Sequence, residues 1–406
     1  MSGPIPFTLV SAAPDSRAAD AAQQQAASET RLQALAGLRI LDTPPEERFD
    51  RIVRLTQQMF DVPTVVVSLI DEDRQFNKAE IGVGAREMPI EDSFCRYTVL
   101  DSSPFVVDDP ENDERFRDTR LVKDGLRFYA GQPLATPAGV RVGSLCIADD
   151  KPRDFTDLQL EMLRLLADIA EAELALTDEL HRAGDVQRRL LPRHVPDLPG
   201  YTVAGTCVPA AAVGGDFYDW FEARDGYQFV VADVMGKGIP AALVGAGARA
   251  VLRGTSQFND IETSVHRTDF AMADDLEEIN SFITMFVARL DYQSHVLSYV
   301  DAGHGIAGVV RADGQAVRFD SQGMPLGLLD FRRTASQITL EPGDTFICLS
   351  DGLLDLFDSI EEAVEAARVT VVDYPDPQEC VDVVAGYARE HQATDDITCI
   401  VVRRDP

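Results

Sequence analysis

The segments VGGDFYDWFEA (213–223) and YQFVVADVMGKG (227–238) decide the fold of the C-terminal half. Their β-branched and aromatic runs predict two strands, and a helix is predicted to follow from Pro240 to Gly254. Asp216 follows two glycines, and Asp233 ends the second apolar run before a glycine-containing turn. A carboxylate at a strand end beside glycine suits a metal site, because glycine lets the main chain approach an ion closely.

Two later segments repeat this arrangement. TFICLSDGLLD (345–355) places Asp351 directly after an apolar run, and ATDDITCIVV (393–402) places Asp395 and Asp396 before the last one. The C-terminal half therefore offers strand-end aspartates at four separate places, without a suitably spaced cluster of His or Cys. Such a set favours oxygen-ligated Mg²⁺ or Mn²⁺ over zinc and is compatible with two ions.

The C-terminal half resembles the PPM (PP2C-like) metal-dependent protein phosphatases, in particular the branch of stage II sporulation protein E and RsbU. The shared motifs follow in family order between residues 186 and 403, and they are VQRRLLPRHVPDLPG, VGGDFYD, ADVMGKGIPAAL, SFITMFVARLD, DAGHGIAGVV, GMPLGLL, LSDGLLD and TDDITCIVV. The resemblance implies an α/β sandwich with antiparallel sheets, two Mn²⁺ or Mg²⁺ ions and hydrolysis of phosphoserine or phosphothreonine in a protein.

The resemblance also implies which residues hold the ions. The set consists of the carboxylates of Asp216, Asp233, Asp351 and Asp395, the main-chain carbonyl of Val234, and Asp396 as the less favoured member of its pair. No side-chain nucleophile is expected, because two divalent ions can activate a water for attack on the phosphate. His304 lies in a glycine-rich turn and is expected to pack and hydrogen-bond there rather than to act as a general acid.

Two other functions fit parts of the pattern. GGDFYD superficially resembles the GGDEF loop of diguanylate cyclases, but Phe217 and Tyr218 stand where Glu and Phe would, and the later Asp motifs would be unexplained. A pseudophosphatase would bind a partner without hydrolysis, but its usual mark, a lost metal carboxylate, is not seen at any of the four positions. We therefore expect an active enzyme.

The N-terminal half is predicted to be an α+β domain with an antiparallel sheet. Amphipathic stretches over 32–41 and 49–60 predict a helix pair, and strands are predicted at PTVVVSLID, PFVVDD, RFYAGQPLAT and VRVGSLCIAD. The half resembles GAF sensor domains over roughly residues 30–173, through RILDTPPEERFDRI, SLIDEDRQFNKAEIG, SFCRYTV, VVDDPENDERF and RFYAGQPLATPAGVRVGSLCIAD. This resemblance implies a cup on one face of the sheet, for a ligand that the sequence does not identify.

Specific ligands of this cup are not indicated. Asn77 and Lys78 resemble the start of the cyclic-nucleotide GAF signature, but the later segment Phe105–Pro110 lacks the expected Asp-Glu pair, so we do not expect nucleotide binding. Cys95 would be a position for a chromophore or a redox sensor. A lone Cys beside Phe94 is more often a small buried residue, and we expect that role.

Residues 155–191 form the most strongly periodic helix of the chain. Steps of four and three residues connect Leu158, Met162, Leu165, Ile169, Ala172 and Leu176. This spacing is that of a left-handed coiled coil, which Leu180 interrupts with a stutter before Gly184. The alternative is a helix packed on its own sheet, which the first part is also expected to do. We expect the helix to join two copies as a homodimer.

Charge and composition limit the partners. Lys and Arg number 37 against 68 Asp and Glu, a net charge of −31, so nucleic acid and anionic membranes are not expected partners. The six cysteines show no CxxC spacing and are expected to be reduced and buried. Without an apolar stretch approaching the ~18 residues needed to span a bilayer, or a signal-like N-terminus, the protein is expected to be cytoplasmic.

The expected organisation is multidomain. It comprises a disordered or partly helical tail (1–27), a GAF sensor domain (28–173), a helical linker (174–195) and a phosphatase domain (196–406). The resemblance to the RsbU branch further implies a partner, a phosphorylated anti-sigma-factor antagonist. Its dephosphorylation would belong to a bacterial stress or sigma-factor partner-switching pathway.

Overall fold

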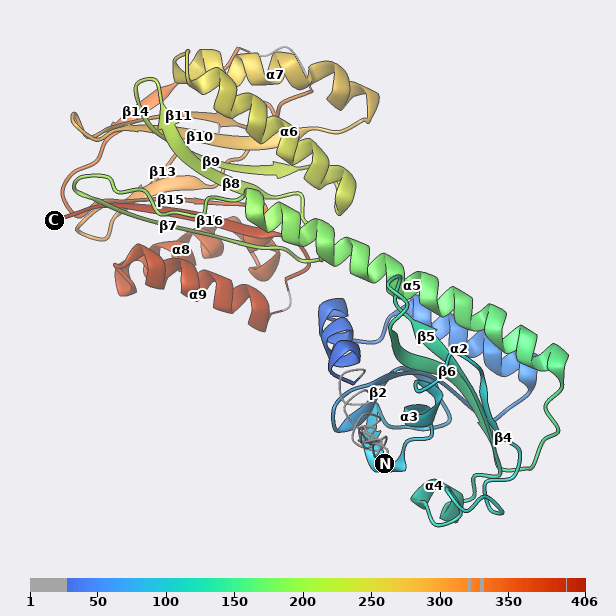
Figure 1. Cartoon of the computed structure of the whole chain (residues 1–406). Helices are drawn as coiled ribbons and strands as arrows, with labels where there is room; N and C mark the ends of the chain where they lie inside the picture. The colour runs from blue at the N-terminus through green and yellow to red at the C-terminus, as the bar shows by residue number, and fades with distance from the viewer. Residues whose placement is uncertain (1–27, 320–322, 329–331, 392) are drawn as a thin grey trace, which may run out of the picture. The chain divides into compact units, whose positions relative to one another are not determined.

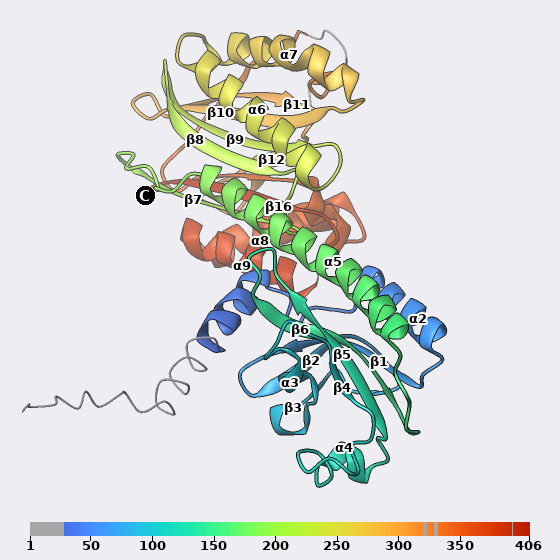
Figure 2. The same ribbon diagram turned by 45° about the vertical axis from the view of Figure 1, so that its right-hand side comes forward.

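The computed structural model describes residues 28–319, 323–328, 332–391 and 393–406, and the expected tail lies outside these ranges. The chain divides into two compact units between Glu179 and Leu180. Both units mix helices and strands (Figures 1 and 2). No helix within the described ranges is both long and apolar enough to cross a membrane.

The first unit opens with the expected helix pair. Residues 28–38 are helical, and the chain then turns with positive φ angles at Arg39 and Asp42, so this helix ends before Leu41 instead of including it. The following elements are α2 (Glu47–Phe60), β1 (Thr64–Ile70), β2 (Arg74–Ile81), β3 (Glu87–Pro89), η1 (Ile90–Asp92), α3 (Cys95–Thr98), β4 (Phe105–Val107), α4 (Arg120–Lys123), β5 (Phe128–Ala135), β6 (Arg141–Asp149) and α5 (Asp157–Leu190).

The strands of this unit form one antiparallel sheet in the order β3-β2-β1-β6-β5-β4, as predicted for the fold class. Helices α2 and α5 cover one face, where Phe49 and Leu163 are completely buried (Figure 1). Helix α3 lies on the other face, within a cluster that includes Phe94, Phe116 and Tyr129. The structure adds β2 and β3 to the four predicted strands.

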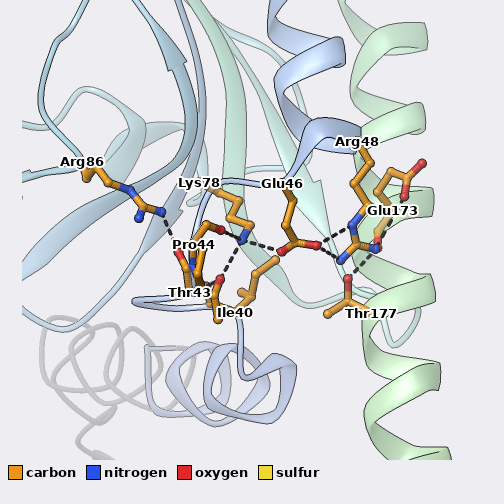
Figure 3. A network of polar contacts seen from close by, with 9 residues as sticks. All are labelled: Ile40, Thr43, Pro44, Glu46, Arg48, Lys78, Arg86, Glu173 and Thr177. Atoms are coloured by element: carbon orange, nitrogen blue, oxygen red, sulfur yellow. Dashed lines mark hydrogen bonds and ion pairs between the residues drawn. The ribbon is translucent and has the colours of Figure 1, made fainter. Parts of the chain in front are cut away.

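A polar network around Lys78 joins β2 to α2 and α5 (Figure 3). Lys78 is 1% exposed; its Nζ donates to Thr43 Oγ1 at 2.6 Å and pairs with the Glu46 carboxylate at 2.5 Å. Arg48 pairs with the same carboxylate and lies 3.6 Å from Glu173 Oε2 on α5. The buried ammonium is thus neutralised inside the domain, as a buried charge requires.

Helix α5 presents two apolar stripes. One is buried against the sheet and contains Leu163, Leu166, Ala167, Ala170 and Leu174. The other contains four of the predicted coiled-coil residues, and the exposed fractions are 70% for Leu158, 56% for Leu165, 45% for Ile169 and 46% for Leu176. Packing on its own sheet therefore leaves a coiled-coil stripe free on the same helix.

The second unit begins in the last turns of α5 and, within its described residues, continues with fifteen elements. They are β7 (Tyr201–Val208), β8 (Phe217–Ala223), β9 (Gly226–Val234), α6 (Ile239–Ser256), α7 (Ile261–Glu278), β10 (Ile283–Asp291), β11 (Val296–Ala302), β12 (Ala307–Val310), β13 (Ala316–Arg318), β14 (Ser336–Thr339), β15 (Thr345–Leu349), η2 (Asp351–Leu356), α8 (Ile360–Asp373), α9 (Pro377–Glu390) and β16 (Ile397–Arg404).

These elements form a four-layered sandwich. The two antiparallel sheets have the orders β14-β11-β10-β9-β8 and β13-β12-β15-β16-β7. Phe229, Phe286, Phe346 and Ile400 meet in the core between them. Helices α6 and α7 cover the outer face of the first sheet, and α8 and α9 cover that of the second (Figure 1). The predicted sandwich with antiparallel sheets is confirmed.

Candidate metal centre

The predicted ligands lie at strand ends of both sheets. Asp216 directly precedes β8, and Asp233 is the penultimate residue of the neighbouring strand β9. In the second sheet Asp351 begins η2 just after β15, and Asp395 lies two residues before the neighbouring strand β16. The charges of Asp351 and Asp395 raise the pKa of Asp233, and the charge of Asp233 raises the pKa of Asp216, so these carboxylates lie near one another. The fold therefore gathers carboxylates from distant segments at one edge of the sandwich.

Asp216 is the most deeply buried of them. Its side chain is 2% exposed, and its Oδ2 atom is buried without a hydrogen-bond partner. Burial, and then the nearby charge of Asp233, raise the pKa of Asp216 well above its ordinary value. A buried carboxylate oxygen without a partner is costly unless a cation binds it, so this residue fits a metal-binding role.

The pKa values of two further carboxyls are raised for the same two reasons, burial and nearby negative charge. Burial and the charges of Asp351 and Asp395 raise the pKa of Asp233 to about 6. Burial and the charge of Asp395 also raise the pKa of Asp351. Bound cations would remove this repulsion. The Val234 carbonyl oxygen faces the same loop, since a Cβ placed on Gly215 would lie only 2.7 Å from it.

Asp396 binds the main chain of the loop that carries Asp216. Its Oδ1 accepts from the Ala210 N–H at 2.8 Å, and its Oδ2 accepts from the N–H groups of Gly215 at 2.7 Å and Asp216 at 3.3 Å. A Cβ on Gly214 would lie 2.3 Å from this carboxylate. The two glycines of the VGGD motif therefore leave room for an anchoring carboxylate and for the Val234 carbonyl.

Asp395 has a cationic partner. Lys237, in the turn after β9, lies 3.2 Å from Asp395 Oδ1 and donates to the Thr394 carbonyl at 2.8 Å. Among the residues that the structure describes, no three His, Cys, Asp or Glu side chains are already arranged to hold a metal ion. The side chains would have to close around a cation.

The end of α5 also contacts the loop that carries Asp216, which the sequence pattern did not predict. Gln187 Nε2 donates to the Gly214 carbonyl at 2.7 Å, and its Oε1 accepts from the Gly214 N–H at 3.1 Å. One turn earlier, a Cβ on Gly184 would lie 2.0 Å from the Ala212 carbonyl oxygen. Gly184 thus allows α5 to approach the loop closely, and the helix continues unbroken through it to Leu190.

His304 is buried and satisfied, as expected. Its Nδ1 lies 3.2 Å from Thr284 Oγ1, and its Nε2 lies 2.8 Å from the Leu349 carbonyl. Burial lowers its pKa, so the neutral form is favoured. The Asp301 carboxylate fixes the turn by accepting from the N–H groups of His304 and Gly305.

Models of known families match both halves of the chain. The model described as stage II sporulation protein E (SpoIIE) matches residues 223–405, and the GAF domain model matches residues 44–174. The cyclic di-GMP phosphodiesterase PA2567 of Pseudomonas aeruginosa is 37% identical over 140 residues, which are 34% of this chain and 24% of that protein. The phosphoserine phosphatase RsbU of Bacillus subtilis is 27% identical over 182 residues, which are 44% of this chain and 54% of RsbU.

Among solved structures, the SiaA-PP2C domain of Pseudomonas aeruginosa is 27% identical with a TM-score of 0.49, and the match covers 58% of this chain and 100% of that chain. The chain matches about a quarter of the length of PA2567 and about half of that of RsbU. By the family models, residues 44–174 belong to the GAF domain family and residues 223–405 to the SpoIIE family of PP2C-like domains.

Proposed function

We propose that the chain is a Mn²⁺- or Mg²⁺-dependent protein phosphatase that hydrolyses phosphoserine or phosphothreonine. The observation that carries this proposal is the gathering of strand-end carboxylates from both sheets around Asp216, whose Oδ2 is buried without a partner. Membership of residues 223–405 in the SpoIIE family supports it. The name of the relative RsbU, a phosphoserine phosphatase, points to the same substrate class.

The proposed ligands are Asp216, Asp233, Asp351, Asp395 and the Val234 carbonyl. When bound, two divalent ions supply positive charge for the phosphate oxygens and lower the pKa of a water. Asp396 serves these ligands indirectly, because its bonds to the main chain fix the direction of the Asp216 side chain. Free of cations, the same carboxylates would repel a phosphate, so activity is expected to depend strictly on the metal.

The proposal is tested by phosphate release from a phosphoserine peptide in Mn²⁺ and after chelation. Asp216→Asn and Asp351→Asn should each lower turnover at least 100-fold, because a lost ligand charge weakens metal binding. Asp313→Asn is the matched control, since Asp313 is exposed in the turn between β12 and β13. Turnover that survives chelation, or Asp216→Asn and Asp351→Asn variants as active as the control, would refute the proposal.

The physiological substrate is proposed to be a phosphorylated anti-sigma-factor antagonist, in a bacterial stress or sigma-factor partner-switching pathway. The relationship to RsbU supports this choice. With a net charge of −31, the global field opposes an anionic phosphoprotein, so recognition must depend on local shape and on the metals. Such antagonists should therefore be dephosphorylated faster than an unrelated phosphopeptide of equal charge.

Regulation is proposed to run through a homodimer formed by α5. The exposed stripe of Leu158, Leu165, Ile169 and Leu176 supports a parallel pairing of two copies. Leu165→Glu with Ile169→Glu should convert a dimer to a monomer in sedimentation velocity. Arg164→Glu, which places a negative charge beside the stripe on an exposed position, should stay dimeric. A monomeric wild-type protein would contradict this part of the proposal and leave the enzymatic part untouched.

A further inference from the structure

Two thiols meet inside the GAF domain. The sulfur atoms of Cys95 on α3 and Cys146 on β6 lie 3.4 Å apart, although 51 positions separate them in the chain. Cys95 is 2% exposed and Cys146 is 5% exposed, within the cluster that covers the α3 face of the sheet. Both thiols are free in the structure. The sequence indicated a small buried residue at Cys95, and the structure adds a second thiol within reach of it.

The surroundings shift the pKa values of the two thiols in opposite directions. Burial raises the pKa of the Cys95 thiol, but hydrogen bonds from Cys146, Ser144, Ser68 and Tyr129 outweigh it and bring the pKa to about 6. The hydrogen bond with Cys95 and burial raise the pKa of Cys146 well above its ordinary value. The Tyr129 hydroxyl donates to Cys95 Sγ at 3.4 Å. The hydrogen-bond donors around Cys95 therefore favour its thiolate, the form that reacts, over that of Cys146.

We propose that Cys95 and Cys146 form a redox-active dithiol, which hydroperoxides convert to a disulfide within the GAF domain. First, the Cys95 sulfur attacks a peroxide oxygen; an S–O bond forms, the O–O bond breaks, and the other oxygen leaves as water or an alcohol after taking a proton. Next, the Cys146 sulfur attacks the Cys95 sulfur; the S–S bond forms, the S–O bond breaks, and the released oxygen leaves as water with the Cys146 proton. The two thiols lose two electrons, and the peroxide gains them.

Closing this bond would move α3. A disulfide holds its sulfur atoms about 2.05 Å apart, so the present 3.4 Å must shrink by about 1.3 Å. Cys146 is fixed in the middle of the sheet, opposite Val66 of β1 and Gly131 of β5. Helix α3 has only four residues and no such ladder, so it is the element that shifts. The dithiol would thus turn an oxidation into a movement on the α3 face of the domain.

The full chain, treated with hydrogen peroxide, then denatured, alkylated with N-ethylmaleimide and digested with trypsin, provides the test. Peptide mapping without reductant should show residues 87–96 linked to residues 142–153, with two of the six thiols lost and both regained after dithiothreitol. Cys146→Ser should form no link and should retain a sulfenic acid at Cys95 that dimedone captures. Cys380→Ser is the control: this thiol lies in the other unit, and burial raises its pKa to about 11, so the link should form as in the wild type.

The wild-type map does not depend on whether the variants fold. Complete alkylation of Cys95 and Cys146 after peroxide treatment would overturn the proposal. So would disulfides that pair either residue with one of the other four cysteines.

Discussion

Asp395 and Asp396 are neighbours in sequence whose carboxylates have different partners. Asp395 lies beside Lys237 and adds its charge to those of Asp233 and Asp351. Asp396 turns toward the main chain and accepts from three N–H groups. A ligand and an anchor should respond differently to the same substitution.

We therefore predict different metal dependence for the two Asn variants. Asp395→Asn should lose activity that added Mn²⁺ does not restore, because a ligand charge is gone. Asp396→Asn should raise the Mn²⁺ concentration for half-maximal phosphate release about tenfold, typical of a residue that orients ligands, with turnover at saturating Mn²⁺ within a few-fold of the wild type. A loss in Asp396→Asn as complete as that in Asp395→Asn would identify Asp396 as a ligand.

Individual residues also show what the sequence could and could not predict. Strand-end position beside glycine was enough to single out Asp216 and Asp233. The contact of Gly214 with Asp396 could not be predicted, because it joins residues 182 positions apart that meet only when the two sheets pack. The pair formed by Cys95 and Cys146 could not be predicted either, because 51 positions separate these residues and only the folded domain brings them together.

Among the elements, apolar strands were predictable and β2 was not. Its sequence, RQFNKAEI, has charged and amide side chains at positions that turn out to be buried. Gln75 donates to Asn77 and accepts from Ser93, and Lys78 pairs with Glu46. Hydrogen bonds and ion pairs to other parts of the chain offset the cost of burying these groups, and periodicity of hydrophobic residues does not reveal such partners.

The Gln187 side chain of helix α5 forms hydrogen bonds with the loop that carries Asp216. Gln187→Ala removes both hydrogen bonds to Gly214, which together contribute about 1–3 kcal/mol to holding the loop. Phosphate release at a Mn²⁺ concentration near half-saturation should fall about tenfold. Arg189→Ala, an exposed change on the same turn, should have no effect. If the two variants have equal activity, the contact between α5 and the loop does not control the site.

At the scale of the whole molecule, the net charge of −31 includes the carboxylates of the candidate metal centre. Their burial and mutual repulsion lower the free energy of unfolding when no cation is bound. The Asp233 carboxyl has its pKa raised from 3.8 to about 6, which costs the folded state on the order of 2–3 kcal/mol above pH 6. Because the folded-state pKa is the higher one, this cost is absent below about pH 4 and grows as the pH rises to 6. A cation bound at these carboxylates would remove this cost. The melting temperature therefore reports directly on metal binding.

The most direct test of the metal centre is the melting temperature of the wild type and of Asp233→Asn at pH 7.5, each with and without Mn²⁺. Without metal, Asp233→Asn should melt a few degrees higher than the wild type, since it lacks the strained charge, and the difference should vanish near pH 4. Mn²⁺ should raise the melting temperature of the wild type and leave that of Asp233→Asn nearly unchanged. An equal effect of Mn²⁺ on both proteins, or no effect on the wild type, would contradict a divalent-cation site at these carboxylates.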